Sequence, residues 1–250
     1  MTLLSILFLV TAALYSSVGF GGGSTYLALL LIWGVPYTIF PIIALVCNIV
    51  VVSGSCFNYI RAGNLNLKML APYIMGSIPF AFIGGLLSID KKIFEILLFF
   101  TLLIAGILLL LNFKSYDEKS LVYKKNSIVP SIVTGGIIGF ISGVVGIGGG
   151  VFLSPILFLL RAGRPQHIVT SASLFILINS IAGIIGQLTK NNILFELLDY
   201  WPLILAVFIG GQLGNFLNLK IISSRILALI TSLLVIFVAI RLCLKIFNLY

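Results

Sequence analysis

Long runs of hydrophobic residues, separated by short polar stretches, make up most of the chain. A helix of about 20 hydrophobic residues spans the hydrocarbon core of a bilayer, which is about 30 Å thick. The pattern predicts eight segments, at residues 3–32, 37–60, 68–89, 93–111, 129–160, 167–189, 197–219 and 222–247. We therefore expect an all-α integral membrane protein with about eight membrane segments.

The order of motifs along the chain indicates an internal duplication. The sequence GFGGG at residues 19–23 is matched by GIGGG at residues 146–150, an offset of 127 residues. Three further matches follow in the same order at offsets of 129 to 131: Pro36 with Pro165, Asn48 with Asn179, and the pair Pro72 and Gly84 with Pro202 and Gly214. Several ordered matches at nearly one offset predict two four-segment repeats.

A polar stretch, NFKSYDEKSLVYKKN at residues 112–126, separates the two halves. We expect a first transmembrane repeat at residues 1–111, a connecting loop at 112–127 and a second repeat at 128–250. Each repeat opens with a segment of about 30 residues, which is too long for one crossing and too short for two. Because glycine costs a helix about 1 kcal/mol relative to alanine, we expect both first segments to be broken at their glycine clusters.

The two glycine clusters form the predicted binding site. Non-helical backbone at membrane depth is tolerated only where it is buried in protein or lines a cavity. Matching breaks in two halves point to the substrate site of a transporter, and freed helix N-termini favour an anion. The predicted substrate-binding residues are the glycines of both clusters and the matched asparagines: Gly19, Gly21, Gly22, Gly23, Asn48, Gly146, Gly148, Gly149, Gly150 and Asn179.

Other small residues at helical spacing have a simpler interpretation. Gly76 and Gly84, like Gly210 and Gly214, recur on one helical face, as in the close packing of membrane helices. Consecutive glycines occupy every face of a helix, which makes the two clusters poor packing motifs. We expect the spaced glycines to pack helices and the clusters to line a site.

Composition and charge support a membrane protein. Hydrophobic residues make up 60% of the chain and charged residues only 8%, whereas a soluble domain carries roughly 25% charged residues. The net charge of +9 comes from Lys and Arg between the hydrophobic runs, as in the loops of membrane proteins, so we expect no nucleic-acid partner. We expect a multi-pass protein of the plasma (inner) membrane of a bacterium, with the lipid bilayer and a small anion as its partners.

The available side chains argue against an enzyme. The six acidic residues lie in loops or near segment ends, and one histidine cannot form a metal site, so we expect no cofactor and no metal. Polar groups at depth are neutral, namely Asn48, Ser53, Ser55, Asn58, Ser171, Ser173, Asn179, Gln187 and Gln212. This lining suits an anion, and an inside-negative potential, worth about 2.3 kcal/mol per charge per 100 mV, favours its export. A sodium site made of carbonyls and hydroxyls would leave no trace in the sequence.

The second glycine cluster and its surroundings carry a family resemblance. The stretch GVVGIGGGVFLSPILFLL, followed by a short loop, His167 and Thr170, resembles the TauE/SafE family of anion exporters, over nearly the whole chain. The resemblance implies a permease for sulfite, organosulfonates or related small anions. The first copy differs, with WGVPYTIFP in place of RAGRPQHIVT. A substrate contact by Arg161, Arg164 or His167 would therefore come from the second half alone.

The predicted function is therefore transport of a small anion, with an anion channel and a non-transporting membrane scaffold subunit as alternatives. Two orientations remain open. If each first segment crosses the membrane, the halves are parallel and the basic residues divide nine to six. If each is a re-entrant hairpin, the halves are inverted and the division is ten to five, which fits the positive-inside rule slightly better. The inverted arrangement places both termini outside and residues 112–126 in the cytoplasm.

Overall fold

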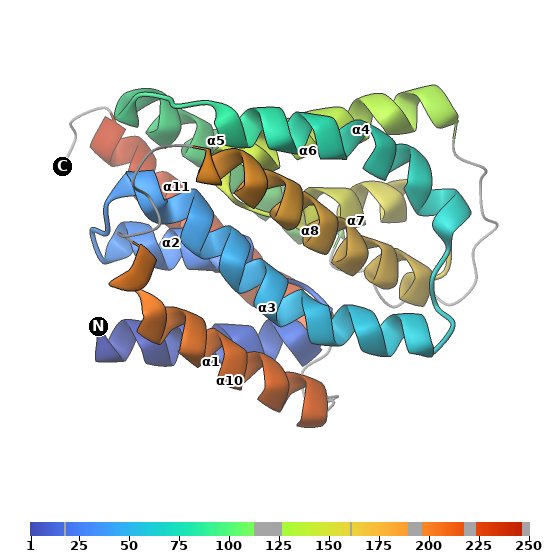
Figure 1. Ribbon diagram of the computed structural model, residues 1–250, viewed down its shortest axis with the longest axis horizontal. Coiled ribbons are helices and arrows are strands. Elements are labelled where there is room, and N and C mark those ends of the chain that lie inside the picture. Colours follow the sequence, from blue (N-terminus) through green and yellow to red (C-terminus); the bar gives the residue numbers. More distant parts are fainter. Residues whose placement is uncertain (18, 113–126, 161, 190–196, 218–223, 247–250) are drawn as a thin grey trace.

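The structure of the chain is a computed structural model, shown in Figure 1. It describes residues 1–17, 19–112, 127–160, 162–189, 197–217 and 224–246. Within these ranges every regular element is a helix. The helices are α1 (Thr2–Ser17), α2 (Gly23–Ile32), the short 3-10 helix η1 (Tyr37–Ile39), α3 (Phe40–Arg61), α4 (Leu67–Leu86), α5 (Lys91–Asn112), α6 (Ile128–Val145), α7 (Gly150–Leu159), α8 (Pro165–Leu188), α10 (Trp201–Leu217) and α11 (Ser224–Ile246).

Four helical spans are long and apolar enough to cross a membrane, judged by length and composition: Tyr37–Arg61, Leu67–Leu86, Ile128–Val145 and Gln166–Leu188. Several shorter apolar helices, α1, α2 and α7 among them, accompany these four. The prediction of an all-helical protein with membrane-spanning segments is confirmed in this form. Most of the predicted polar loop, residues 113–126, lies outside the described residues.

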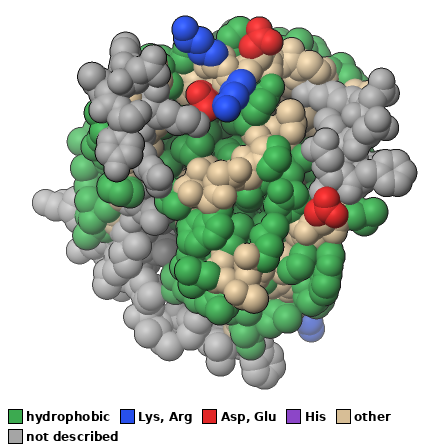
Figure 2. Space-filling model, turned by 90° about the vertical axis from the view of Figure 1, so that its left-hand side faces the viewer, with side chains coloured by type: hydrophobic (Ala, Val, Ile, Leu, Met, Phe, Trp, Pro, Cys, Tyr) green, Lys and Arg blue, Asp and Glu red, His purple; other side chains and the backbone are tan. Residues whose placement is uncertain are grey.

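Many large hydrophobic side chains of the described helices are exposed on the outer surface. Figure 2 looks at one end of the molecule, where Lys, Arg, Asp and Glu side chains lie among hydrophobic residues. Met75 on α4 is 68% exposed and Phe237 on α11 is 62% exposed. Polar side chains such as Asn48 and Ser171, in contrast, are fully buried. An apolar exterior around buried amides and hydroxyls is suited to lipid, because exposing so much apolar surface to water costs free energy.

Two pairs of helices pack so closely that only glycine fits between them. A Cβ atom at Gly76 of α4 would overlap the carbonyl oxygen of Ile132 in α6, and Gly84 meets α6 in the same way. A Cβ atom at Gly210 of α10 would overlap the carbonyl oxygen of Leu9 in α1. The prediction that these spaced glycines serve helix packing is confirmed.

We expect Gly76→Ala to lower the free energy of unfolding by about 1–3 kcal/mol, because the added methyl group forces α4 and α6 apart. Gly211→Ala in α10 is the matched control, since its Cβ would lie 3.6 Å from Val51, an ordinary contact. The control should be neutral or slightly stabilising, as alanine favours a helix. Thermal unfolding in detergent measures both, and equal midpoints for the two variants would contradict this packing.

Helices α3 and α8 lie side by side at the centre and run in opposite directions (Figure 1). Leu45, early in α3, lies against Gly183, late in α8. At the other end, His167 Nδ1, early in α8, donates a hydrogen bond of 2.9 Å to the carbonyl oxygen of Asn64, just after α3. This antiparallel pair forms the framework on which the two glycine clusters are placed.

Candidate binding site where the glycine clusters meet

Each glycine cluster lies between the end of one helix and the start of the next. Helix α1 ends at Ser17 and α2 begins at Gly23, while α6 ends at Val145 and α7 begins at Gly150. We call residues 19–23 the first glycine segment and residues 146–150 the second. Five of their glycines have a φ angle that side chains with a Cβ rarely adopt: Gly19 (80°), Gly22 (83°), Gly146 (88°), Gly148 (83°) and Gly149 (77°). All glycines of both segments are buried.

The two glycine segments touch each other around one side chain of α3. A Cβ atom at Gly23 would lie 2.5 Å from the carbonyl oxygen of Ile147 and 2.7 Å from Asn48 Nδ2. A Cβ atom at Gly148 would lie 2.6 Å from the same nitrogen, and one at Gly21 would lie 2.5 Å from Asn48 Oδ1. We call this contact region the glycine junction: Gly21, Gly23, Asn48, Ile147 and Gly148.

The Asn48 amide at the junction is buried and unpaired. Its exposed fraction is 0%, and neither Nδ2 nor Oδ1 has a hydrogen-bond partner within the described part of the chain. Leaving a buried polar group unsatisfied costs about 1–3 kcal/mol, so folded proteins pair nearly all such groups. An amide kept unpaired at this position is available to a ligand that supplies the missing partner.

Two helices begin at the junction without side-chain caps. The residues preceding α2 and α7 are Gly22 and Gly149, and neither helix start receives a side-chain hydrogen bond. The first N–H groups of a helix have no partner inside the helix, and its N-terminus carries about +0.5 elementary charge. Two such ends beside the Asn48 amide create a positive, hydrogen-bond-donating environment without a charged side chain.

The matched asparagine of α8 is placed differently. Asn179 is also fully buried, but its Nδ2 donates a hydrogen bond of 2.9 Å to the Phe175 carbonyl oxygen of its own helix, and only its Oδ1 is unpaired. The α8 side chain that lies against the junction is Ile176, whose Cγ2 would be 3.0 Å from a Cβ at Gly148 and 3.2 Å from one at Gly21. The two halves therefore present unlike side chains to the glycines.

The remaining predicted glycines contact residues around the junction. A Cβ atom at Gly19 would meet the Tyr59 ring, and one at Gly22 would meet Tyr26. The neighbours of the second segment are Pro41 for Gly146, Phe175 and Ile138 for Gly149, and Ile176 for Gly150. The glycines thus allow close approach of α3 and α8 to both segments and of α6 to the second segment.

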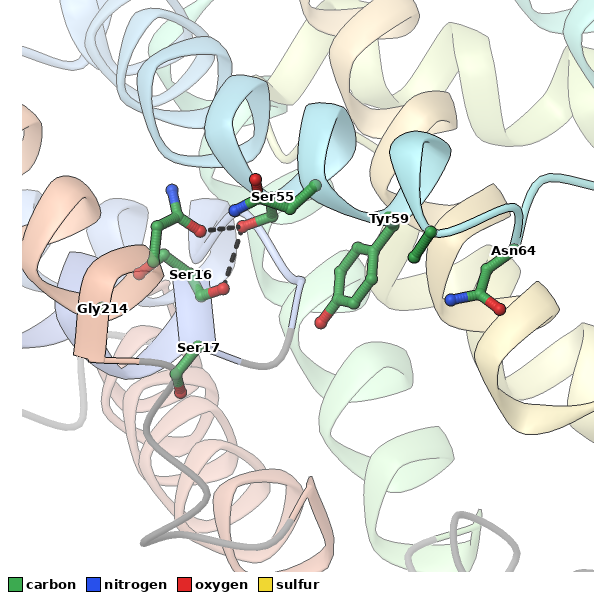
Figure 3. Close-up of a pocket in the computed structure, with 9 residues that line it drawn as sticks. Ser16, Ser17, Ser55, Tyr59, Asn64 and Gly214 are labelled. Carbon is green, nitrogen blue, oxygen red and sulfur yellow. Dashed lines mark hydrogen bonds between the residues drawn. The ribbon is translucent and has the colours of Figure 1, made fainter.

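A polar cavity of about 290 Å³ lies next to the first glycine segment, between α1, α3 and α10 (Figure 3). Its lining residues are Ser16, Ser17, Ser55, Asn58, Tyr59, Ala62, Asn64, Gly214 and Asn215. Tyr59 both lines the cavity and lies against Gly19, so it connects the cavity to the first glycine segment. Ser55 and Asn58 are among the polar residues predicted at depth, whereas Ser16, Tyr59 and Asn215 carry no sequence signal, and only the folded chain brings them together.

The apolar exterior, the membrane-length helices and the buried polar junction define a multi-pass helical membrane protein. The family model described as "Sulfite exporter TauE/SafE" matches residues 4–242, and the chain belongs to this family. No solved structure matches the chain.

Three curated relatives are each named "Probable membrane transporter protein". The relative from Sinorhizobium fredii is 28% identical over 235 residues, which cover 92% of this chain and 93% of that protein. The one from Methanocaldococcus jannaschii is 29% identical over 195 residues, or 72% and 70% of the two chains. The one from Bacillus subtilis is 22% identical over 259 residues, or 93% and 94%. The family and these names indicate a membrane transporter and not an enzyme.

Proposed function

We propose that this protein transports small anions, namely sulfite, sulfonates or related sulfur-containing anions, and binds them at the glycine junction. The observation that carries the proposal is the Asn48 amide, which is fully buried and unpaired between two uncapped helix N-termini. Two N-termini together supply about one elementary positive charge, and backbone N–H groups at such ends bind oxyanions. The substrate class follows the description of the family.

The burial of Asn48 supports a transporter over an open channel. Gly21, Gly23 and Gly148 enclose its amide, so an anion reaches it only when the two glycine segments separate. Binding that requires such a conformational change limits flux to one substrate per cycle. A scaffold subunit would need the glycines for packing alone, and the spaced glycines of α4 and α10 already fulfil that role.

We further propose that residues 1–111 and 128–250 are inverted four-segment repeats whose first segments are re-entrant hairpins. In support, α10 packs along α1 as α4 packs along α6, and the matched helices α3 and α8 are antiparallel. Figure 1 supports it as well, since the N-terminus, the end of α2 and the start of α3 lie at one end of the molecule. The start of α6 lies at the opposite end.

Inverted repeats predict that the C-terminus lies outside the cytoplasm. A C-terminal reporter that is active only in the cytoplasm should therefore be inactive, because α11 then ends on the outer side. The same reporter fused after residue 120, within the polar loop, is the control and should be active. Activity at both positions would contradict the inverted arrangement.

The function is tested by flux into proteoliposomes at a clamped membrane potential. We expect saturable uptake of at least one anion from a panel of sulfite, sulfonates, sulfate and carboxylates, with a rate that rises when the lumen is made positive. Non-saturating flux with single-channel events would favour the channel alternative. Flux no greater than that of empty liposomes for every anion would contradict the proposal.

A further inference from the structure

The polar cavity between α1, α3 and α10 lies where two helices end. Helix α1 ends at Ser17 and α3 ends at Arg61, and both present their last turns to the cavity. A helix C-terminus carries about −0.5 elementary charge and has carbonyl groups without partners inside the helix. We infer that the two helix ends favour positive charge in the cavity, none of whose lining residues has a charged side chain.

The serine hydroxyls around the cavity donate their protons to carbonyl oxygens of the protein. Ser16 Oγ donates to the Ala13 carbonyl at 3.2 Å, and Ser17 Oγ donates to the Leu14 carbonyl at 2.7 Å. Ser55 Oγ donates to the Ser16 carbonyl at 2.9 Å, as Figure 3 shows. A hydroxyl has one proton and two lone pairs, so these oxygens have only acceptor capacity left for a ligand. Such oxygens stabilise a cation and not an anion.

A contact with Asn215 bears on whether the Ser55 oxygen can act as an acceptor toward a ligand. Ser55 Oγ also lies 2.9 Å from Asn215 Oδ1, but one proton cannot serve two acceptors fully. If the amide is turned over, Asn215 Nδ2 donates to Ser55 Oγ while Ser55 still donates to Ser16. This orientation places Oδ1 against Gly54 in the position that Nδ2 otherwise occupies. The Ser55 oxygen is then held in the cavity wall as an acceptor.

The repeat-related place in the described structure lacks the polar side chains of this cavity. At the repeat offsets of 127 to 131 residues, the matched positions hold glycine: Gly143 for Ser16, Gly186 for Ser55 and Gly85 for Asn215. A Cβ atom at Gly143 would overlap the Ala81 carbonyl oxygen, and one at Gly186 would lie 2.9 Å from Gly85 Cα. Because glycines satisfy close packing at the matched place, we infer that the serines of the first half and the asparagine of the second half serve something besides packing.

We propose that this cavity binds a monovalent alkali cation that is coupled to anion movement at the glycine junction. Calcium and magnesium prefer carboxylates, which the lining lacks, whereas neutral oxygens and helix C-termini hold sodium in transporters. A volume of about 290 Å³ holds an ion with part of its water shell, since one water occupies about 30 Å³.

The coupling has a structural basis in the first glycine segment. The C-terminus of α1 faces the cavity on one side of this segment, and the N-terminus of α2 faces the junction on the other. Tyr59 lines the cavity and packs on Gly19, so a cation that orders this wall also orders the segment that contacts Asn48. The coupling rests on the proposed anion transport, whereas cation binding does not.

Cation binding is measured by thermal unfolding of the full chain in detergent. LiCl, NaCl and KCl are titrated against choline chloride at constant ionic strength and chloride concentration. We expect at least one alkali cation to raise the unfolding midpoint in a saturable way. Ser17→Ala and Ser55→Ala should each raise its half-saturating concentration by about fivefold, the effect of losing one oxygen contact.

Ser53→Ala is the matched control, because Ser53 lies on the same helix, donates to its own helix at Ile49 and is exposed away from the cavity. It should bind the cation as the wild type does. Stabilisation by no alkali cation beyond choline would overturn the proposal. Wild-type response in both Ser17→Ala and Ser55→Ala would overturn it equally.

Anion flux in proteoliposomes separates this inference from the proposed function. A cation gradient that accelerates anion flux, with less effect in Ser17→Ala, supports the coupling. Saturable anion flux that is the same in choline overturns the coupling and leaves the proposed function standing. Cation stabilisation without any anion flux supports the cation site and counts against the proposed function.

Discussion

Asn48→Ala is expected to reduce saturable anion transport by at least tenfold while leaving the protein as stable as the wild type or more stable. The amide has no hydrogen bond to lose within the described chain, so its removal relieves an unsatisfied group. If the amide binds the anion, its loss removes a charge-assisted hydrogen bond worth about 1.5–3 kcal/mol, or roughly 10- to 100-fold in affinity. Uptake kinetics and thermal unfolding are measured on the same preparation.

Asn179→Ala is the natural comparison for this variant. Its side chain is equally buried, but it donates a hydrogen bond to the Phe175 carbonyl oxygen, which would be left without that donor. We expect Asn179→Ala to lower the unfolding midpoint and to affect transport less than Asn48→Ala does. A destabilised Asn48→Ala protein with unchanged affinity would show that Asn48 has a structural role only.

Gly23→Ala is the second variant expected to reduce transport strongly. Its Cβ would lie 2.5 Å from the Ile147 carbonyl oxygen and 2.7 Å from Asn48 Nδ2, so the methyl group would push the two glycine segments apart. Gly23 is not among the glycines with positive φ, and alanine favours the start of α2, so the substitution adds no backbone strain. We expect at least a tenfold loss of transport rate, measured by flux into proteoliposomes.

Gly63→Ala controls for backbone effects on this result. Gly63 has a φ of 74°, and a Cβ added there would meet nothing within 4 Å. This variant therefore tests backbone strain without a steric clash. We expect it to lose about 1 kcal/mol in stability and to retain transport. If Gly23→Ala transports at the wild-type rate, contact between the two glycine segments is irrelevant to function.

The helices could be predicted from hydrophobic patterning because lipid imposes a simple rule on length and polarity. The segment predicted at residues 93–111, for example, corresponds to α5 at Lys91–Asn112. The same patterning says little about which side chains meet in the interior. Nothing in the sequence distinguishes Asn48 from Asn179, yet the packing of α3 leaves Asn48 unpaired while Asn179 bonds to its own helix.

The cavity could not be predicted for a related reason. Ser55 and Asn215 contact each other across 160 residues of sequence, and serines near helix ends are too common to carry a signal alone. The negative potential that we propose for the cavity depends on the ends of α1 and α3, which are backbone features that no particular residue type marks in the sequence. The glycine clusters stand out in the sequence because their backbone conformation demands a particular residue.

The most direct test of the central claim is to locate the bound anion. Selenite is a selenium analogue of sulfite, and its anomalous scattering identifies its position in a crystal of the protein. We expect a selenium peak within hydrogen-bonding distance of the Asn48 amide, between the first residues of α2 and α7, and its loss in Asn48→Ala crystals. A peak only in the polar cavity between α1, α3 and α10, or only at the protein surface, would contradict it.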